Sequence, residues 1–231
     1  MELTPRPWRI EADPGTWLLA AAATPAPEPL LLQLDRLTPL TSGLQQQLQA
    51  WLDPLERQRQ LALKRPADQQ RFLLARAGLR RLLGLWRGED PARVPIASHR
   101  HGKPFCPDGP QFNLSHSGDL ILLALHPHRP VGVDVERQRP GLDWEPIARR
   151  VLPAAELAVL AALPASQRPE RFVQAWCRLE ARLKARGCGL AGLERLRGEA
   201  VIAGNHPGER LWDVALPPGY HGALACLQPR R

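Results

Sequence analysis

Two long stretches of helical periodicity, with short apolar runs before and after each, constrain the fold of this 231-residue chain more than any other feature. The first covers residues 54–86 and the second residues 143–186, and prolines interrupt both. Apolar side chains recur in them every three or four residues, as one face of a helix requires. Gly187 follows the second stretch and is typical of a helix C-cap. The pattern predicts an α+β chain in two halves that join near residue 130.

The apolar runs around these stretches predict the strands. They are Trp8–Glu11, Trp17–Ala23, Phe112–Leu114, Leu120–Leu125, Val131–Glu136 and short pieces within residues 199–227. Residues 24–43 are rich in Pro, Thr and Leu and predict irregular structure, apart from a short helix that begins at Leu44. Residues 115–118 have the composition of a turn.

The charge of the chain favours an anionic partner. Lys and Arg total 31 against 23 Asp and Glu, so the net charge is +8, and only Lys64, Lys103 and Lys184 are lysines. Such a surplus suits a nucleic acid, a phosphorylated cofactor or an acidic protein. Nucleic acid is disfavoured, because the chain has one Tyr and four Phe for stacking and no zinc-finger or RNA-recognition signature.

Cellular location is constrained by three sequence features. The apolar runs are too short to span a bilayer, which argues against a membrane protein. The N-terminal residues lack a secretory signal pattern. The four cysteines are scattered without a Cys-x-x-Cys pair, so the expected state is a cytoplasmic protein with free thiols.

One candidate cluster is the alternating segment Val131–Glu136. On a strand, Asp134 and Glu136 are two residues apart and project to the same face. Paired hard oxygen ligands of this kind suit Mg²⁺. The alternative is an exposed strand face that carries two solvated acids.

A second cluster lies near the end of the second helical stretch. Trp176, Glu180 and Lys184 are spaced four residues apart and share one helix face. If the Trp176 face partly buries Glu180, this carboxylate can act as a metal ligand or a base. The alternative is an ordinary amphipathic helix with a Glu-to-Lys pair.

The third cluster is Asn113–Ser117, which follows the loop Gly102–Pro104. Two hydroxyls, an imidazole and backbone N–H groups could cradle an anion. An ordinary polar turn is an equal alternative. Ser115 is a poor candidate for a nucleophile, because no orienting acid is evident.

In this order and spacing the clusters resemble the Sfp-type branch of the 4′-phosphopantetheinyl transferase family. The matching segments are Gly102–Pro104, Asn113–Ser117, Gly132–Glu136, Trp176–Leu190 and, in the first helical stretch, Arg71–Arg76, so the resemblance covers roughly residues 51–190. It implies two similar α+β halves related by a pseudo-twofold axis, with the active site between them. The halves would be residues 1–128 and residues 129–231, and the second would hold the metal-binding carboxylates.

The resemblance also implies the reaction and its residues. The phosphopantetheine arm of coenzyme A would move to a serine of an acidic apo carrier protein, and adenosine 3′,5′-bisphosphate would be released. Mg²⁺ would be held by Asp134, Glu136 and Glu180, with Glu180 and Lys184 as catalytic residues. Coenzyme A would be contacted by Lys103, Ser115, His116, Lys184, Arg59 and Arg71. A cytoplasmic monomer that binds neither nucleic acid nor membrane is expected, and its carrier could serve fatty-acid, polyketide or non-ribosomal peptide synthesis.

One residue departs from the family pattern. The family usually has lysine directly before the helix glutamate, where this chain has Leu179. The departure keeps open an alternative, namely a non-catalytic module that binds coenzyme A or a carrier protein. A basic ridge on the same helix, Arg178, Arg182 and Arg186, could face an acidic carrier or simply solvent.

Overall fold

The computed structural model describes residues 1–10, 28–193 and 208–228, and the expected strand Trp17–Ala23 lies outside them. The strands are β1 (Glu2–Leu3), β2 (Arg6–Pro7), β3 (Leu30–Asp35), β4 (Ala97–Ser98), β5 (Pro104–Phe105), β6 (Gln111–Ser117), β7 (Leu120–His126), β8 (Val131–Arg137), β9 (Glu209–Val214) and β10 (Tyr220–Leu227). The α-helices are α2 (Ser42–Trp51), α3 (Pro54–Ala62), α4 (Pro66–Arg87), α5 (Glu145–Val151), α6 (Ala154–Ala162) and α7 (Arg168–Arg186). Short 3₁₀ turns span η1 (Pro91–Arg93), η2 (Ala165–Gln167) and η3 (Leu190–Gly192).

The two halves repeat one chain path. In the first half, β3 leads to the long helix α4 and then to the hairpin β6–β7, whose second strand pairs antiparallel with β3. In the second half, β8 leads to α7 and then to the hairpin β9–β10, whose second strand pairs antiparallel with β8. The sheets therefore run β2-β3-β7-β6 and β1-β9-β10-β8, and the mixed α+β class is confirmed.

One short strand crosses between the halves. β1 lies at the start of the chain but pairs in parallel with β9, which places residues 2 and 3 in the sheet of the second half. A division of the chain at residues 128 and 129 stays a prediction.

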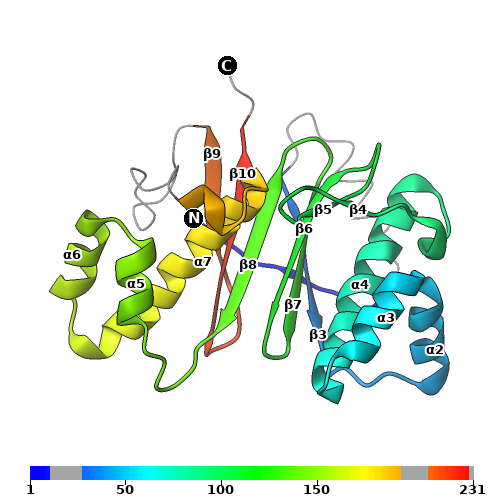
Figure 1. The fold of residues 1–231 in the computed structure, drawn as a ribbon, viewed down its shortest axis with the longest axis horizontal. Coiled ribbons are helices and arrows are strands. Elements are labelled where there is room, and N and C mark those ends of the chain that lie inside the picture. The colour runs from blue at the N-terminus through cyan, green and yellow to red at the C-terminus, as the bar shows by residue number, and fades with distance from the viewer. Residues whose placement is uncertain (11–27, 194–207, 229–231) are drawn as a thin grey trace.

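Alternating side chains sort the strands into layers. On β7, Ile121 and Leu123 face the helices of the first half, whereas Leu122 and Ala124 face the opposite sheet. On β8, Val133 and its neighbours two residues away join this core between the sheets. The result is helices, sheet, sheet and helices, with the two sheets in the middle of the molecule and a helix group on each side (Figure 1). The end strands β6 and β8 thereby meet at the centre.

The helix boundaries follow local signals. Asp53 and Glu56 form a capping box at the start of α3, and Pro66 begins α4. Gly187 ends α7 with a left-handed backbone (φ 65°), which glycine adopts without the cost that a Cβ would bring. The expected helices and their break at Pro66 are confirmed. None of the described helices is long and apolar enough to cross a membrane.

Three local expectations are wrong. Residues 115–117 belong to strand β6, and the turn begins only at Gly118. Within residues 24–43, predicted to be irregular, Leu30–Asp35 forms a strand because alternate leucines fill two cores. Near the N-terminus, Arg6–Pro7 is the strand, and the Trp8 N–H directly after it donates to the Gln33 carbonyl.

Candidate active site

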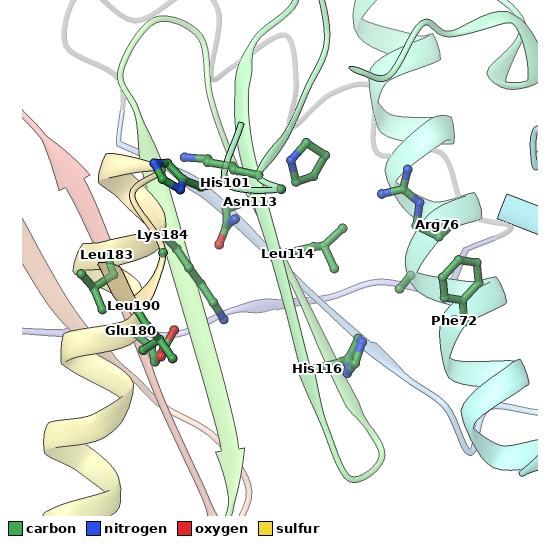
Figure 2. Close-up of a pocket in the computed structure, with 16 residues that line it drawn as sticks. Phe72, Arg76, His101, Asn113, Leu114, His116, Glu180, Leu183, Lys184 and Leu190 are labelled. Atoms are coloured by element: carbon green, nitrogen blue, oxygen red, sulfur yellow. The ribbon is translucent and has the colours of Figure 1, made fainter. Parts of the chain in front are cut away.

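A cavity of about 530 Å³ lies between the two halves. Figure 2 shows Phe72 and Arg76 of α4 on one side, Glu180 and Lys184 of α7 on the other, and β6 between them. The lining residues are Phe72, Ala75, Arg76, His101–Pro104, Asn113, Leu114, His116, Glu180, Leu183, Lys184, Gly187, Gly189 and Leu190. The two halves and two of the three candidate clusters therefore contribute to the same wall. The segment Val131–Glu136 is not among the lining residues, and Asp134 is linked to the wall through its contact with Lys184.

The contact between α7 and β8 sets one end of this site. Gly132 touches the helix so closely that a Cβ there would lie 2.1 Å from the Ala181 carbonyl oxygen and 2.2 Å from the Ala185 nitrogen. Only a residue without a side chain allows this approach. Because strand residues two apart share a face, Asp134 and Glu136 face the same helix, which carries Glu180 and Lys184.

Asp134 is the most buried acid of the site, at 3% exposure. Its Oδ1 accepts from Lys184 Nζ at 2.6 Å and from the Ser115 hydroxyl at 3.0 Å. Lys184 also donates to Ser115 Oγ at 3.2 Å. A buried carboxylate needs such partners, because its desolvation would otherwise be costly.

Glu136 and Glu180 complete a group of acids that influence one another. Burial raises the pKa of Glu136, and the Asp134 carboxylate raises it further, against the Ser117 hydroxyl that donates to Glu136 at 2.9 Å. Burial also raises the pKa of Glu180, where Asp134 and Glu136 add to the rise and Lys184 opposes it. The expectation that Glu180 is partly buried is confirmed.

The donor set fits a hard cation. Asp134 Oδ2 is buried and has no hydrogen-bond partner among the described residues. An acid oxygen left in this way, beside two acids that repel it, suits a divalent metal with oxygen ligands. Within the described ranges no three His, Cys, Asp or Glu side chains are already gathered as a metal site.

The predicted coenzyme-binding residues are distributed unequally. His116 lines the cavity, and its pKa is lowered by burial and by the nearby Arg71 guanidinium. Ser115 is not among the lining residues, because its hydroxyl faces Asp134 and Lys184. Lys103 lines the cavity, but its Nζ donates to the carbonyls of Val131 (2.9 Å) and Ala185 (3.3 Å). Burial lowers the pKa of Lys103 to about 8.

The two arginines of the first half lie elsewhere. Arg71 donates to the Gly118 carbonyl at 2.8 Å and pairs with Asp68, so it holds the β6–β7 turn. Arg59 is exposed on α3, and the structure does not bring it to the cavity wall.

The basic ridge expected on α7 is not a surface. Arg182 is fully buried against Glu209, which also accepts from Arg186 at 2.7 Å. Arg178 forms two bonds, of 2.8 and 2.7 Å, with Asp213. The suggestion that this ridge faces an acidic carrier is therefore wrong, because strand β9 supplies the carboxylates that the arginines contact.

Sequence reasoning missed several wall residues. Phe72 and Arg76 are four apart on α4 and share a face, a signal that was available within the segment Arg71–Arg76. Arg76 pairs with the buried Glu56, which fixes its stem. His101 directly precedes the Gly-Lys-Pro loop and also lines the cavity.

Leu179 is not among the residues that line the cavity. It is 1% exposed and packs in the apolar core of the second half, which α5, α6, α7 and the second sheet share. The structure therefore gives this departure from the family pattern a packing role.

Comparison with known proteins identifies relatives of this chain. Residues 130–210 match the model of the 4′-phosphopantetheinyl transferase superfamily. The 4′-phosphopantetheinyl transferase HetI of Nostoc sp. is 38% identical over 136 residues, which are 57% of each chain. The slr0495 protein of Synechocystis sp., which bears the name of the same transferase, is 34% identical over 172 residues, or 73% of this chain and 68% of the relative.

A shorter match extends to another transferase. The 4′-phosphopantetheinyl transferase AcpT of Escherichia coli O157:H7 is 44% identical over 88 residues, 37% of this chain and 45% of the relative. The chain thus spans less than two thirds of the length of HetI and of AcpT, and about two thirds of the Synechocystis protein.

Proposed function

The chain belongs to the 4′-phosphopantetheinyl transferase superfamily, and on that basis we propose that it transfers the 4′-phosphopantetheine arm of coenzyme A to a serine of an apo carrier protein. Adenosine 3′,5′-bisphosphate is the second product. The observation that carries the proposal is the cavity between the halves, where Arg76 of α4 lies across from Glu180 and Lys184 of α7 and where Lys184 pairs with Asp134 of β8.

The reaction forms one bond and breaks another at the same phosphorus. The carrier serine oxygen attacks the phosphorus nearest the pantetheine, and the bond from that phosphorus to the bridging oxygen of the pyrophosphate breaks. Negative charge then grows on the leaving phosphate, where fixed cations stabilise it best. Lys184 and His116 line the cavity wall and are the proposed phosphate contacts, Lys184 as the cation and His116, whose pKa is lowered by burial, as a hydrogen-bond donor.

Asp134, Glu136 and Glu180 are the proposed ligands of Mg²⁺, and the unpartnered Asp134 Oδ2 is the oxygen that most needs one. When bound, the ion supplies positive charge that offsets charge growth on the pyrophosphate. Lys184 already contacts Asp134, so its ammonium lies next to the same charges.

Glu180 is the proposed base. A serine hydroxyl is a weak nucleophile near neutral pH, so a carboxylate must accept its proton. Burial and the neighbouring acids raise the pKa of Glu180, which makes it a better proton acceptor than an exposed glutamate. Glu180→Gln is therefore expected to fold normally and to lose turnover, and a wild-type rate in this variant would remove the assigned role.

The other predicted contacts take revised roles. We propose that Lys103 and Ser115 hold the wall in place through their hydrogen bonds rather than by direct contact with phosphate. Arg71 supports the turn beside His116, and Arg59 is left without a role. The partner is proposed to be an acidic carrier protein and the protein a cytoplasmic monomer. Its four free cysteines suit a reducing compartment.

A mass-shift assay tests the function. Purified protein is mixed with coenzyme A and a panel of apo carriers, with Mg²⁺ present or chelated. Gain of one phosphopantetheine arm on a carrier, only with Mg²⁺, is the expected result. Binding of coenzyme A without transfer to any carrier would instead support the non-catalytic module, and absence of both would overturn the proposal.

A further inference from the structure

Alternate side chains of β6 accept hydrogen bonds from the backbone along the edge of β8. The two strands end different sheets, so their junction is made by side chains. Asn113 Oδ1 accepts the N–H of Val133 at 2.9 Å, and Ser115 Oγ accepts the N–H of Val135 at 3.3 Å. Two residues further along, Ser117 Oγ accepts the N–H of Arg137 at 3.0 Å. Three successive outward N–H groups of β8 are thereby satisfied, as buried backbone donors must be.

The two serines repeat one arrangement. Each accepts a backbone N–H from β8 and donates its own proton to the acid one residue earlier on that strand. Ser115 donates to Asp134 Oδ1 at 3.0 Å, and Ser117 donates to Glu136 Oε2 at 2.9 Å. Because the backbone bond fixes the serine oxygen, the serine in turn fixes the orientation of the carboxylate.

Among these side chains of β6, Ser117 is the one whose contribution can be tested separately from the others. Ser115 also touches Lys184, so its removal would disturb several groups at once. Ser117 is buried, at 7% exposure, and its only recorded side-chain partner in the described structure is Glu136.

We propose that Ser117 is a positioning residue, which holds the Glu136 carboxylate for the metal ion of the site. The inference rests on the proposed function, because it needs Glu136 to be a metal ligand. Groups that orient a ligand from behind are worth about 10- to 100-fold in metal affinity when they are removed. Loss of the Ser117 hydroxyl should therefore weaken metal binding while the residues that line the cavity stay in place.

The test compares Ser117→Ala with Ser117→Thr, which keeps the hydroxyl, and with Ser166→Ala as a matched control. Ser166 is exposed in η2 and makes no recorded contact with the site. Mn²⁺ is titrated into each protein saturated with coenzyme A and without carrier, and free Mn²⁺ is followed by electron paramagnetic resonance. Urea unfolding is measured on the same samples.

The expected result is a dissociation constant for Mn²⁺ about tenfold or more higher in Ser117→Ala, close to wild type in Ser117→Thr and unchanged in Ser166→Ala. Lower stability of Ser117→Ala with wild-type Mn²⁺ affinity would mean a purely structural role and overturn the inference alone. A wild-type protein that binds no Mn²⁺ would overturn the metal site as well. If Ser117→Ala does not fold, Ser117→Cys gives the same comparison, because a weaker donor should also weaken Mn²⁺ binding.

Discussion

The closest backbone approach in the site gives a sharp prediction about Gly132. In Gly132→Ala the new methyl group would meet the Ala181 oxygen at 2.1 Å and the Ala185 nitrogen at 2.2 Å, whereas ordinary contacts begin at 3.4 Å. Both are backbone atoms of α7, so no side chain can swing aside. The strand and the helix would have to separate by about 1 Å, and strain of this kind costs about 1–3 kcal/mol of unfolding free energy.

The same movement changes the site. Glu180 and Lys184 lie on the helix that moves, and Asp134 lies on the strand that stays with its sheet. A displacement of about 1 Å between reacting groups can lower a rate about 100-fold. We therefore expect Gly132→Ala to fold with reduced stability and to transfer the phosphopantetheine arm about 100-fold more slowly.

Urea unfolding and the initial rate of carrier modification measure the two effects. Gly43→Ala is the matched control, because a Cβ at Gly43 of α2 meets nothing within 4 Å and an added methyl favours a helix. This control should keep the wild-type rate and lose no stability. Wild-type stability and rate in Gly132→Ala would refute the argument that the close contact of α7 with β8 sets the geometry of the site.

Three further predictions test buried charges. Glu209→Gln removes the carboxylate that Arg182 and Arg186 contact, and it should lower the unfolding free energy in urea by about 3–5 kcal/mol. Asp213→Asn, which breaks the more exposed pair with Arg178, should lower it by about 1 kcal/mol or less. Leu179→Lys puts an unpaired charge into the core and should cost about 3–5 kcal/mol without raising the transfer rate, while Leu179→Met should cost less than about 1.5 kcal/mol. Lys103 should make stability depend on pH: with a folded pKa of about 8 and an ordinary value of 10.5, the unfolded state holds more protons between these values. As the pH rises through this window, the unfolding free energy of the wild type should therefore increase relative to that of Lys103→Met, by up to about 3 kcal/mol.

Each of these has a clear contrary outcome. Equal losses in Glu209→Gln and Asp213→Asn would mean that burial of the pair at Glu209 has no energetic consequence. A faster transfer in Leu179→Lys would show that a lysine at this position reaches the site after all. A difference between wild type and Lys103→Met that stays constant from pH 8 to pH 10.5 would contradict the lowered pKa of Lys103.

The sequence was informative wherever the partner of a residue is near in the chain or fixed by periodicity. Helical spacing placed Glu180 and Lys184 on one face, and alternation placed Asp134 and Glu136 on another. Ser117 illustrates the opposite case. Its segment has the composition of a turn, but its hydroxyl accepts from an N–H of β8 and donates to the Glu136 carboxylate, 19 residues away. No local sequence pattern can reveal partners at that distance.

The prediction of a basic surface ridge on α7 was wrong for the same reason. A run of arginines at helical spacing predicts a solvated or docking face, because unpaired arginine is rarely buried. Arg182 is buried nonetheless, because Glu209 lies on a strand that only the tertiary fold brings to it. Long-range ion pairs of this kind decide which charged face is inside, and they leave no periodic signal in the sequence.

The alternation of β8 links the stability of the fold to the geometry of the site. Val133 and Val135 fill the core between the sheets, and the residues between and beside them, Asp134 and Glu136, face α7. A slip of one residue would turn the valines toward the helix and the acids into that core. The slip would also bring a side chain to the place of Gly132, where the helix leaves no room for one. The apolar core and the missing side chain at Gly132 therefore select the one register in which the carboxylates face α7, the helix that carries Glu180 and Lys184.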